Sequence, residues 1–188
     1  MMTLVIGSSN SGKSSLAEQL CLETGDERRY YLATMQVLGP EGEARVQRHR
    51  AMREGKGFVT LERPLLVDKA ILEMEDPEHC TVLLECVANL VGNTMHEAAS
   101  IFPKEAHEEA AEARFADRVT AELVQLSAGV HHLIAVTDEY PAESPDYDAE
   151  TRQYVRLLAL VNERLKKTAD RVLLVSGSNE DRKGGGPK

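Results

Sequence analysis

The chain has 188 residues and a formal net charge of −9, with 42% hydrophobic residues but only 4% aromatic ones and no Trp. This length suits one domain with an aliphatic core, and the negative charge argues against nucleic acid or an anionic membrane surface as the main partner. The three cysteines have no C-x-x-C spacing, which argues against a disulfide framework and favours a reducing cytoplasm.

Short continuous apolar runs, typical of buried parallel strands, recur along the chain. They predict strands at Thr3–Ile6, Tyr30–Thr34, Thr81–Cys86, His132–Thr137 and Arg171–Val175. The segments between them predict helices at Ser14–Leu22, Glu43–Arg53, Pro64–Met74, Val87–Ile101, Glu108–Ser127 and Ala149–Lys167. Strands that alternate with helices indicate an α/β fold in which helices flank a mainly parallel sheet.

No apolar run approaches the ~20 residues that a membrane-spanning helix needs. The apolar stretch before the first glycine loop is also too short for a signal peptide. We therefore expect a protein of the cytoplasm without a membrane span.

The first predicted strand runs into the sequence GSSNSGKS, Gly7 to Ser14, which fits the P-loop pattern G-x-x-x-x-G-K-[ST] at every fixed position. Glycines allow the backbone N–H groups to converge on phosphate oxygens, and the N-terminus of the following helix adds partial positive charge. Lys13 is expected to reach the β- and γ-phosphates, and the Ser14 hydroxyl to ligate Mg²⁺. The alternative, an ordinary Gly/Ser turn, does not require the full pattern between a strand and a helix.

We interpret residues 1–176 as a single P-loop nucleotide-binding catalytic domain. Residues 177–188 are polar and glycine-rich, so they are predicted to form a flexible C-terminal tail.

A basic segment stands out in this acidic chain. The segment EARVQRHRAMR, Glu43 to Arg53, would place Arg45, His49 and Arg53 on one helical face. Two guanidiniums beside a neutral imidazole would suit attack of the ring on a phosphorus atom. From composition alone, a solvated charged helix is the favoured explanation of the segment. His131 and His132, at the start of a predicted strand, are interpreted as structural.

Two acidic positions follow predicted strands, where open α/β sheets bind ligands. Glu85 ends one strand and is expected to act near Mg²⁺ or to accept hydrogen bonds from a ribose or guanine. Asp138, after the next strand, is the weaker candidate of the two. For either carboxylate, the plain alternative is a helix N-cap.

In order along nearly its whole length, the chain resembles the bifunctional adenosylcobinamide kinase/adenosylcobinamide-phosphate guanylyltransferase family (CobU type). The matching segments are GSSNSGKS, YLAT, EARVQRHR, AMREGKGFVTLE, LLECVANLVGN, VTDEYP and VNERLKKTADRVLLVSG. Only the P-loop is specific by itself, whereas the order and spacing of all seven segments together are specific.

The resemblance implies a RecA-like P-loop fold and two activities in cobalamin biosynthesis. Adenosylcobinamide is phosphorylated with ATP or GTP, and GMP from GTP then passes through a guanylyl-histidine to give adenosylcobinamide-GDP. By this resemblance His49 carries the GMP, Lys13 is catalytic, Mg²⁺ is the cofactor, and the protein is a homotrimer. The nucleotide site would consist of Gly7, Ser8, Ser9, Asn10, Ser11, Gly12, Lys13, Ser14, Ala33, Thr34, Met35, Arg50, Ala51, Met52, Arg53, Glu62 and Glu85.

Two other readings stay open at this point. One is a P-loop small-molecule kinase without guanylyl transfer, which would leave no nucleotide on the protein. The other is a non-catalytic nucleotide-binding descendant of the family, which would bind nucleotide without turnover.

Overall fold

The computed structural model describes residues 1–36, 55–101 and 109–176. The predicted helix Glu43–Arg53 and the predicted tail 177–188 lie outside these residues. Within the described ranges, no helix combines the length and apolar character that a membrane crossing would require.

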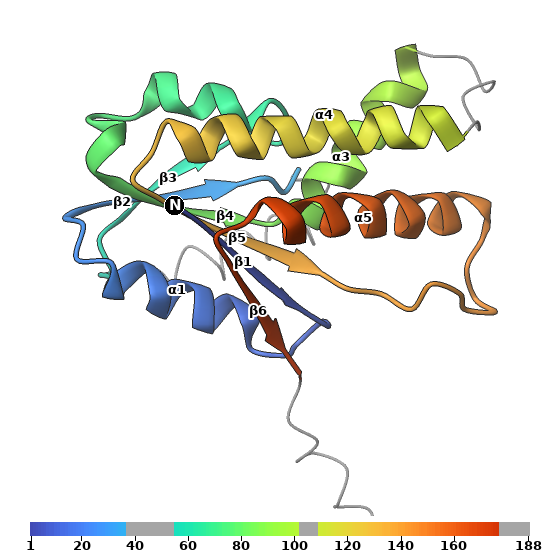
Figure 1. Ribbon diagram of the computed structural model, residues 1–188, viewed down its shortest axis with the longest axis horizontal. Helices are drawn as coiled ribbons and strands as arrows, with labels where there is room; N and C mark the ends of the chain where they lie inside the picture. Colours follow the sequence, from blue (N-terminus) through green and yellow to red (C-terminus); the bar gives the residue numbers. More distant parts are fainter. Residues whose placement is uncertain (37–54, 102–108, 177–188) are drawn as a thin grey trace, which may run out of the picture.

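One six-stranded sheet, with every strand pair parallel, forms the centre of the molecule (Figure 1). Its order is β3-β2-β4-β5-β1-β6. The strands are β1 (Met2–Gly7), β2 (Arg28–Ala33), β3 (Phe58–Glu62), β4 (Cys80–Glu85), β5 (His132–Asp138) and β6 (Arg171–Val175). Strand β5 lies between β1, which leads into the P-loop, and β4, which ends in Glu85. The expected α/β, RecA-like P-loop arrangement is therefore confirmed.

Helices cover both faces of the sheet. The helices are α1 (Lys13–Glu23), α3 (Val87–Ile101), α4 (Glu109–Ala128) and α5 (Ala149–Thr168). Figure 1 shows α1 on one side of the sheet and α4 and α5 on the other. Right-handed crossovers between parallel strands produce this layering, because each connecting helix must pack back onto a sheet face.

The core is aliphatic, as the composition predicts. β1, β4 and β5 are buried along nearly their whole length, so their sequences read as unbroken apolar runs. Helix α5 buries one face, with Leu157, Leu158, Val161 and Leu165 all at most 3% exposed. Its start is capped by Asp148, whose Oδ1 accepts a hydrogen bond of 2.7 Å from the Thr151 N–H.

The structure corrects the sequence reading at two places between residues 55 and 79. Strand β3 was not predicted, because Thr60 and Glu62 interrupt its apolar residues, so no continuous apolar run marks it. The predicted helix Pro64–Met74 is a 3₁₀ helix over Val67–Glu73, followed by a second over Pro77–His79. Leu66, with φ 52°, adopts the left-handed conformation immediately before the first of them, so the chain does not enter a helix at Pro64.

Candidate active site

The P-loop, Gly7–Ser14, connects the carboxyl end of β1 to the first turn of α1. Gly12 has φ 87°, which a glycine adopts without the steric penalty of other residues. At Gly7 the restriction is space: a Cβ there would lie 2.5 Å from Ser11 Oγ and 2.6 Å from the Val175 carbonyl oxygen. Both glycines of the pattern therefore serve the loop conformation itself, which is a phosphate-binding one.

Lys13 is held over the loop by two oxygen atoms. Its Nζ lies 2.7 Å from Asp138 Oδ1 and donates a hydrogen bond of 3.1 Å to the Ser8 carbonyl. Asp138 pairs with Gly7 in the sheet register, so the carboxylate stands at the same edge as the P-loop. The ammonium and the carboxylate are 11% and 15% exposed, which makes this a largely desolvated pair beside the candidate phosphate site.

Glu85 ends β4, and its carboxylate contacts Ser14, the last residue of the P-loop pattern, in the first turn of α1. Ser14 Oγ donates a hydrogen bond to Glu85 Oε1, and the Tyr31 hydroxyl donates one of 2.9 Å to Oε2. Of the roles that the sequence left open for Glu85, this geometry favours action beside the expected Mg²⁺ ligand Ser14. A hydroxyl and a carboxylate together are hard oxygen donors of the kind that Mg²⁺ takes.

We expect Glu85→Gln to lower the turnover of Mg²⁺-dependent nucleotide reactions by about ten- to hundredfold, since groups that orient a metal ligand have effects of this size. The substitution keeps the size of the side chain but removes its charge, so more Mg²⁺ should be needed for half-maximal rate. The measurement is initial rate against Mg²⁺ concentration at saturating nucleotide. Glu62→Gln is the matched control, and an equal shift of the Mg²⁺ dependence in both variants would contradict the role of Glu85.

A hydrogen-bonded junction links the end of β2 to the start of α3. Thr34 donates from its backbone N–H to the Glu85 carbonyl (3.1 Å) and from its hydroxyl to the Cys86 carbonyl (2.7 Å). Asn93 Nδ2 donates to the Thr34 carbonyl at 2.7 Å. Burial raises the pKa of the Cys86 thiol to about 12, so this cysteine is neutral and unsuited to act as a nucleophile at neutral pH.

Glu62 lies far from the P-loop across the sheet. It ends β3 and pairs with Ala33 of β2, so four strand spacings, about 19 Å, separate it from β1. The structure therefore brings Glu62 next to Ala33 but not to Lys13 or Ser14. A side chain at this distance suits the base end of a nucleotide better than its phosphates.

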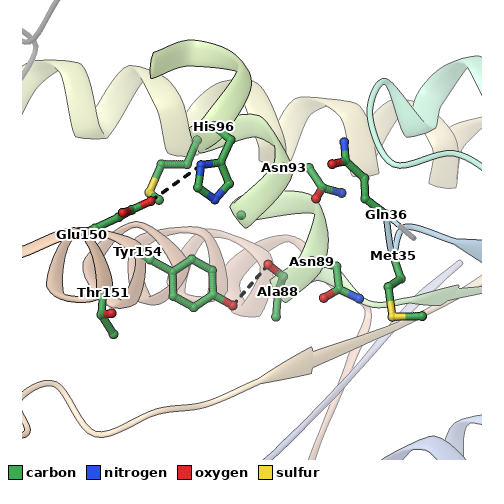
Figure 2. Close-up of a pocket in the computed structure, with 11 residues that line it drawn as sticks. Met35, Gln36, Ala88, Asn89, Asn93, His96, Glu150, Thr151 and Tyr154 are labelled. Atoms are coloured by element: carbon green, nitrogen blue, oxygen red, sulfur yellow. Dashed lines mark hydrogen bonds and ion pairs between the residues drawn. The ribbon is translucent and has the colours of Figure 1, made fainter. Parts of the chain in front are cut away.

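A pocket of about 390 Å³ lies beside this site, between α3 and the first turns of α5 (Figure 2). Met35 and Gln36 form one side of it, and Tyr154 projects from α5 with its hydroxyl donating to the Ala88 carbonyl at 3.2 Å. The ring of Tyr154 lies 6.2 Å from that of Tyr140, two residues after Asp138. The pocket thus borders the same sheet edge as the P-loop.

Most of the predicted site residues lie at one edge of the sheet, and the others are not among the residues that the structure describes. The described members at the carboxyl edge of the sheet are Gly7, Ser8, Ser9, Asn10, Ser11, Gly12, Lys13, Ser14, Ala33, Thr34, Met35, Glu62 and Glu85. The predicted residues His49, Arg50, Ala51, Met52 and Arg53 lie outside the described residues. The structure adds the contact of Asp138 with Lys13, which sequence reasoning had ranked below Glu85, and the hydrogen bonds of Tyr31 and Asn93, to which it had given no role. The alternation within β2, which puts Tyr31 on the side of Ala33, was the available signal for the tyrosine.

The site combines a P-loop at the start of a helix, an ion-paired lysine, and a serine beside a carboxylate at a strand end. These features define a nucleotide-binding α/β protein of the P-loop class. The family model described as cobinamide kinase / cobinamide phosphate guanyltransferase (CobU) matches residues 3–179. The chain belongs to this family, as the resemblance in the sequence indicated, and the family is one of transferases.

Curated relatives agree with this assignment. The chain is 33% identical over 184 residues to the bifunctional adenosylcobalamin biosynthesis protein CobU of Escherichia coli K12, covering 94% of this chain and 97% of that protein. The protein of the same name from Salmonella typhimurium LT2 is 31% identical over 180 residues, with the same coverage of each chain. CobP of Pseudomonas aeruginosa PAO1 is 34% identical over 95 residues, which are 50% of this chain and 53% of CobP.

Among solved structures, the flagellar accessory protein FlaH of Methanocaldococcus jannaschii aligns with a TM-score of 0.47 and 13% sequence identity. The alignment covers 92% of this chain and 70% of FlaH.

Proposed function

We propose that this protein phosphorylates adenosylcobinamide and then transfers GMP from GTP to the phosphorylated product, giving adenosylcobinamide-GDP. The observation that carries the proposal is the meeting of Lys13 with Asp138, and of Ser14 with Glu85, at the P-loop edge of a chain that matches the family over residues 3–179. Both steps need a bound triphosphate, which this edge is suited to hold.

In the kinase step, the acceptor hydroxyl oxygen forms a bond to the γ-phosphorus, and the bond from that phosphorus to the β–γ bridging oxygen breaks. Lys13 turns from Asp138 and the Ser8 carbonyl to the β- and γ-phosphates, where it stabilises the departing nucleoside diphosphate. Asp138, released from the ion pair, takes the proton of the hydroxyl. Ser14, with Glu85 beside it, would hold Mg²⁺, and the ion would supply positive charge next to the phosphates.

In the transfer step, His49 attacks the α-phosphorus of GTP and pyrophosphate leaves. The phosphate oxygen of the phosphorylated acceptor then attacks the same phosphorus, the phosphorus–nitrogen bond breaks, and the free imidazole returns. This step rests on the family resemblance of the segment around His49, and Arg50 and Arg53 would neutralise the phosphate chain.

The pocket between α3 and α5 is the part of the described structure that suits the acceptor. Asn89 and Thr151 present polar side chains at its wall, and such groups can pair with the amide side arms of a corrinoid. A volume of about 390 Å³ holds a side arm but not a whole macrocycle, so the ring itself would remain at the mouth.

The test is to incubate the protein with Mg²⁺, GTP and adenosylcobinamide, and to identify products by mass spectrometry. We expect the phosphorylated product and then the GDP derivative. Phosphorylated product alone would support the kinase-only reading, and the absence of both products would support the non-catalytic reading.

In the same assay, Gly92→Leu should narrow the pocket, because a Cβ at Gly92 already lies 3.7 Å from the Tyr154 ring. Its KM for adenosylcobinamide should rise about tenfold or more while the KM for GTP stays unchanged. The reverse pattern would contradict the placement of the acceptor.

The homotrimer implied by the resemblance stays a prediction, to be measured as solution mass by sedimentation equilibrium.

A further inference from the structure

A cluster of three metal-ligating side chains lies at the amino edge of the sheet, away from the P-loop. Asp26, in the loop before β2, faces both histidines at the start of β5. Its Oδ1 lies 2.9 Å from His131 Nδ1, and its Oδ2 lies 3.1 Å from His132 Nδ1. The two imidazole rings are tilted by 52°, with centroids 4.0 Å apart, so both present the same nitrogen to one carboxylate.

A polar framework fixes the carboxylate. The Asp26 side chain is 10% exposed, and Thr81 Oγ1 donates a hydrogen bond of 2.6 Å to its Oδ2. Thr81 Oγ1 lies 2.8 Å from Thr24 Oγ1, and Thr81 pairs with His132 across β4 and β5. The sheet register therefore sets the separation between the carboxylate and the His132 ring before any ligand binds.

The distances suit a small cation. The three candidate ligand atoms all lie within 4.8 Å of one another. Around Zn²⁺, with ligand distances of about 2.0–2.1 Å and tetrahedral angles, neighbouring ligand atoms lie about 3.3 Å apart. The two observed separations between an imidazole Nδ1 and a carboxylate oxygen, 2.9 and 3.1 Å, are close to this value. On metal binding the imidazole protons would move to Nε2, freeing the Nδ1 lone pairs for the metal.

We propose that Asp26, His131 and His132 bind one divalent transition-metal ion of the zinc class, which ties the segment before β2 to the start of β5. Two imidazole nitrogens with one carboxylate favour Zn²⁺ or Co²⁺ over Mg²⁺ or Ca²⁺, which prefer oxygen ligands alone. The hydrogen bond from Thr81 orients the carboxylate as a second layer of contacts does in known metal sites. His131 is 54% exposed in its side chain, so a water molecule completes the coordination from solvent.

This site stabilises the fold and takes no part in nucleotide chemistry. All strands are parallel, so the starts of β2 and β5 lie at the opposite edge from the P-loop. Metal binding should therefore raise Tm without changing the affinity for GTP. Tm with added metal tests the metal site, and GTP affinity tests the nucleotide site, so either proposal can fail without the other.

The experiment uses the full chain without a histidine tag, stripped of metal and free of nucleotide and Mg²⁺. Co²⁺ is titrated while its visible absorption is recorded, and Zn²⁺ is then added as competitor. We expect one equivalent of Co²⁺ with the intense bands of a low-coordinate site, displaced by one equivalent of Zn²⁺. Asp26→Asn and His131→Gln should each weaken Co²⁺ binding by about a hundredfold, and the rise of Tm with Zn²⁺ should disappear.

The matched control is the exposed pair Asp76–His79, whose Nδ1 to Oδ1 distance of 2.8 Å repeats the contact without a second imidazole. His79→Gln should bind Co²⁺ like the unmodified chain. Because His131 is exposed, His131→Gln keeps the fold even if Asp26→Asn disturbs it, and unchanged GTP affinity verifies folding in each variant. Absence of stoichiometric Co²⁺ binding, or equal binding in His131→Gln and the unmodified chain, would overturn the proposal.

Discussion

Lys13→Ala is expected to reduce kcat/KM for both nucleotide-dependent steps by at least about a hundredfold. A charge-assisted hydrogen bond contributes about 1.5–3 kcal/mol to binding, and a group that stabilises charge in the transition state contributes about 10²–10³ in rate. The structure adds a second effect. Because the ammonium lies 2.7 Å from Asp138, its removal leaves this largely desolvated carboxylate beside the phosphate site without a neighbouring cation, which weakens triphosphate binding further.

The measurement is steady-state kinetics of phosphate transfer and of guanylyl transfer at varied GTP. Lys13→Met is the companion variant, because it keeps the length of the side chain and separates loss of charge from loss of packing. Lys166→Ala is the matched control, since its ammonium forms an exposed pair with Glu139 at 3.4 Å. Near-normal activity in Lys13→Met would show that the P-loop lysine does not act on the phosphates.

His49→Ala is expected to abolish covalent labelling of the protein by α-labelled GTP. Near neutral pH an imidazole with a reference pKa of about 6.5 is largely unprotonated, so it can attack phosphorus without a separate base. Arg50 and Arg53 follow within four residues and would stabilise the charge that develops on the phosphates. The resulting phosphorus–nitrogen bond should be labile in acid and stable in alkali, unlike a serine ester.

The protein is incubated with Mg²⁺ and α-labelled GTP, denatured, and counted after acid and alkali treatment. His79→Ala should label like the unmodified chain, because that histidine is exposed and pairs with Asp76. His49→Ala should keep the kinase step, so retention of adenosylcobinamide phosphorylation shows that the variant folds. Label that persists in His49→Ala would exclude His49 as the carrier, and no label in the unmodified chain would favour the kinase-only reading.

The P-loop and most of the sheet were readable from the sequence because each depends on neighbouring residues. The GSSNSGKS pattern specifies a phosphate loop through local backbone freedom and the helix that follows. Strands β1, β4 and β5 are buried on both faces, so composition alone marks them. β3 was not predicted because Thr60 interrupts its apolar residues, whereas β6, the other edge strand, keeps the continuous run from Val172 to Val175.

The tertiary structure alone decided which distant residues meet. Ser14 and Glu85 are 71 positions apart, and they touch because the crossover after β1 lays α1 over β4 and β5. Strand order also placed Asp138 beside Lys13 and Glu62 far from both. Asp26 and His131, 105 positions apart, meet because β2 and β5 both flank β4 and start at one edge. Local propensity specifies loops and strands, but the order in which strands pair is a property of the whole packed sheet, and it determines which charges face one another.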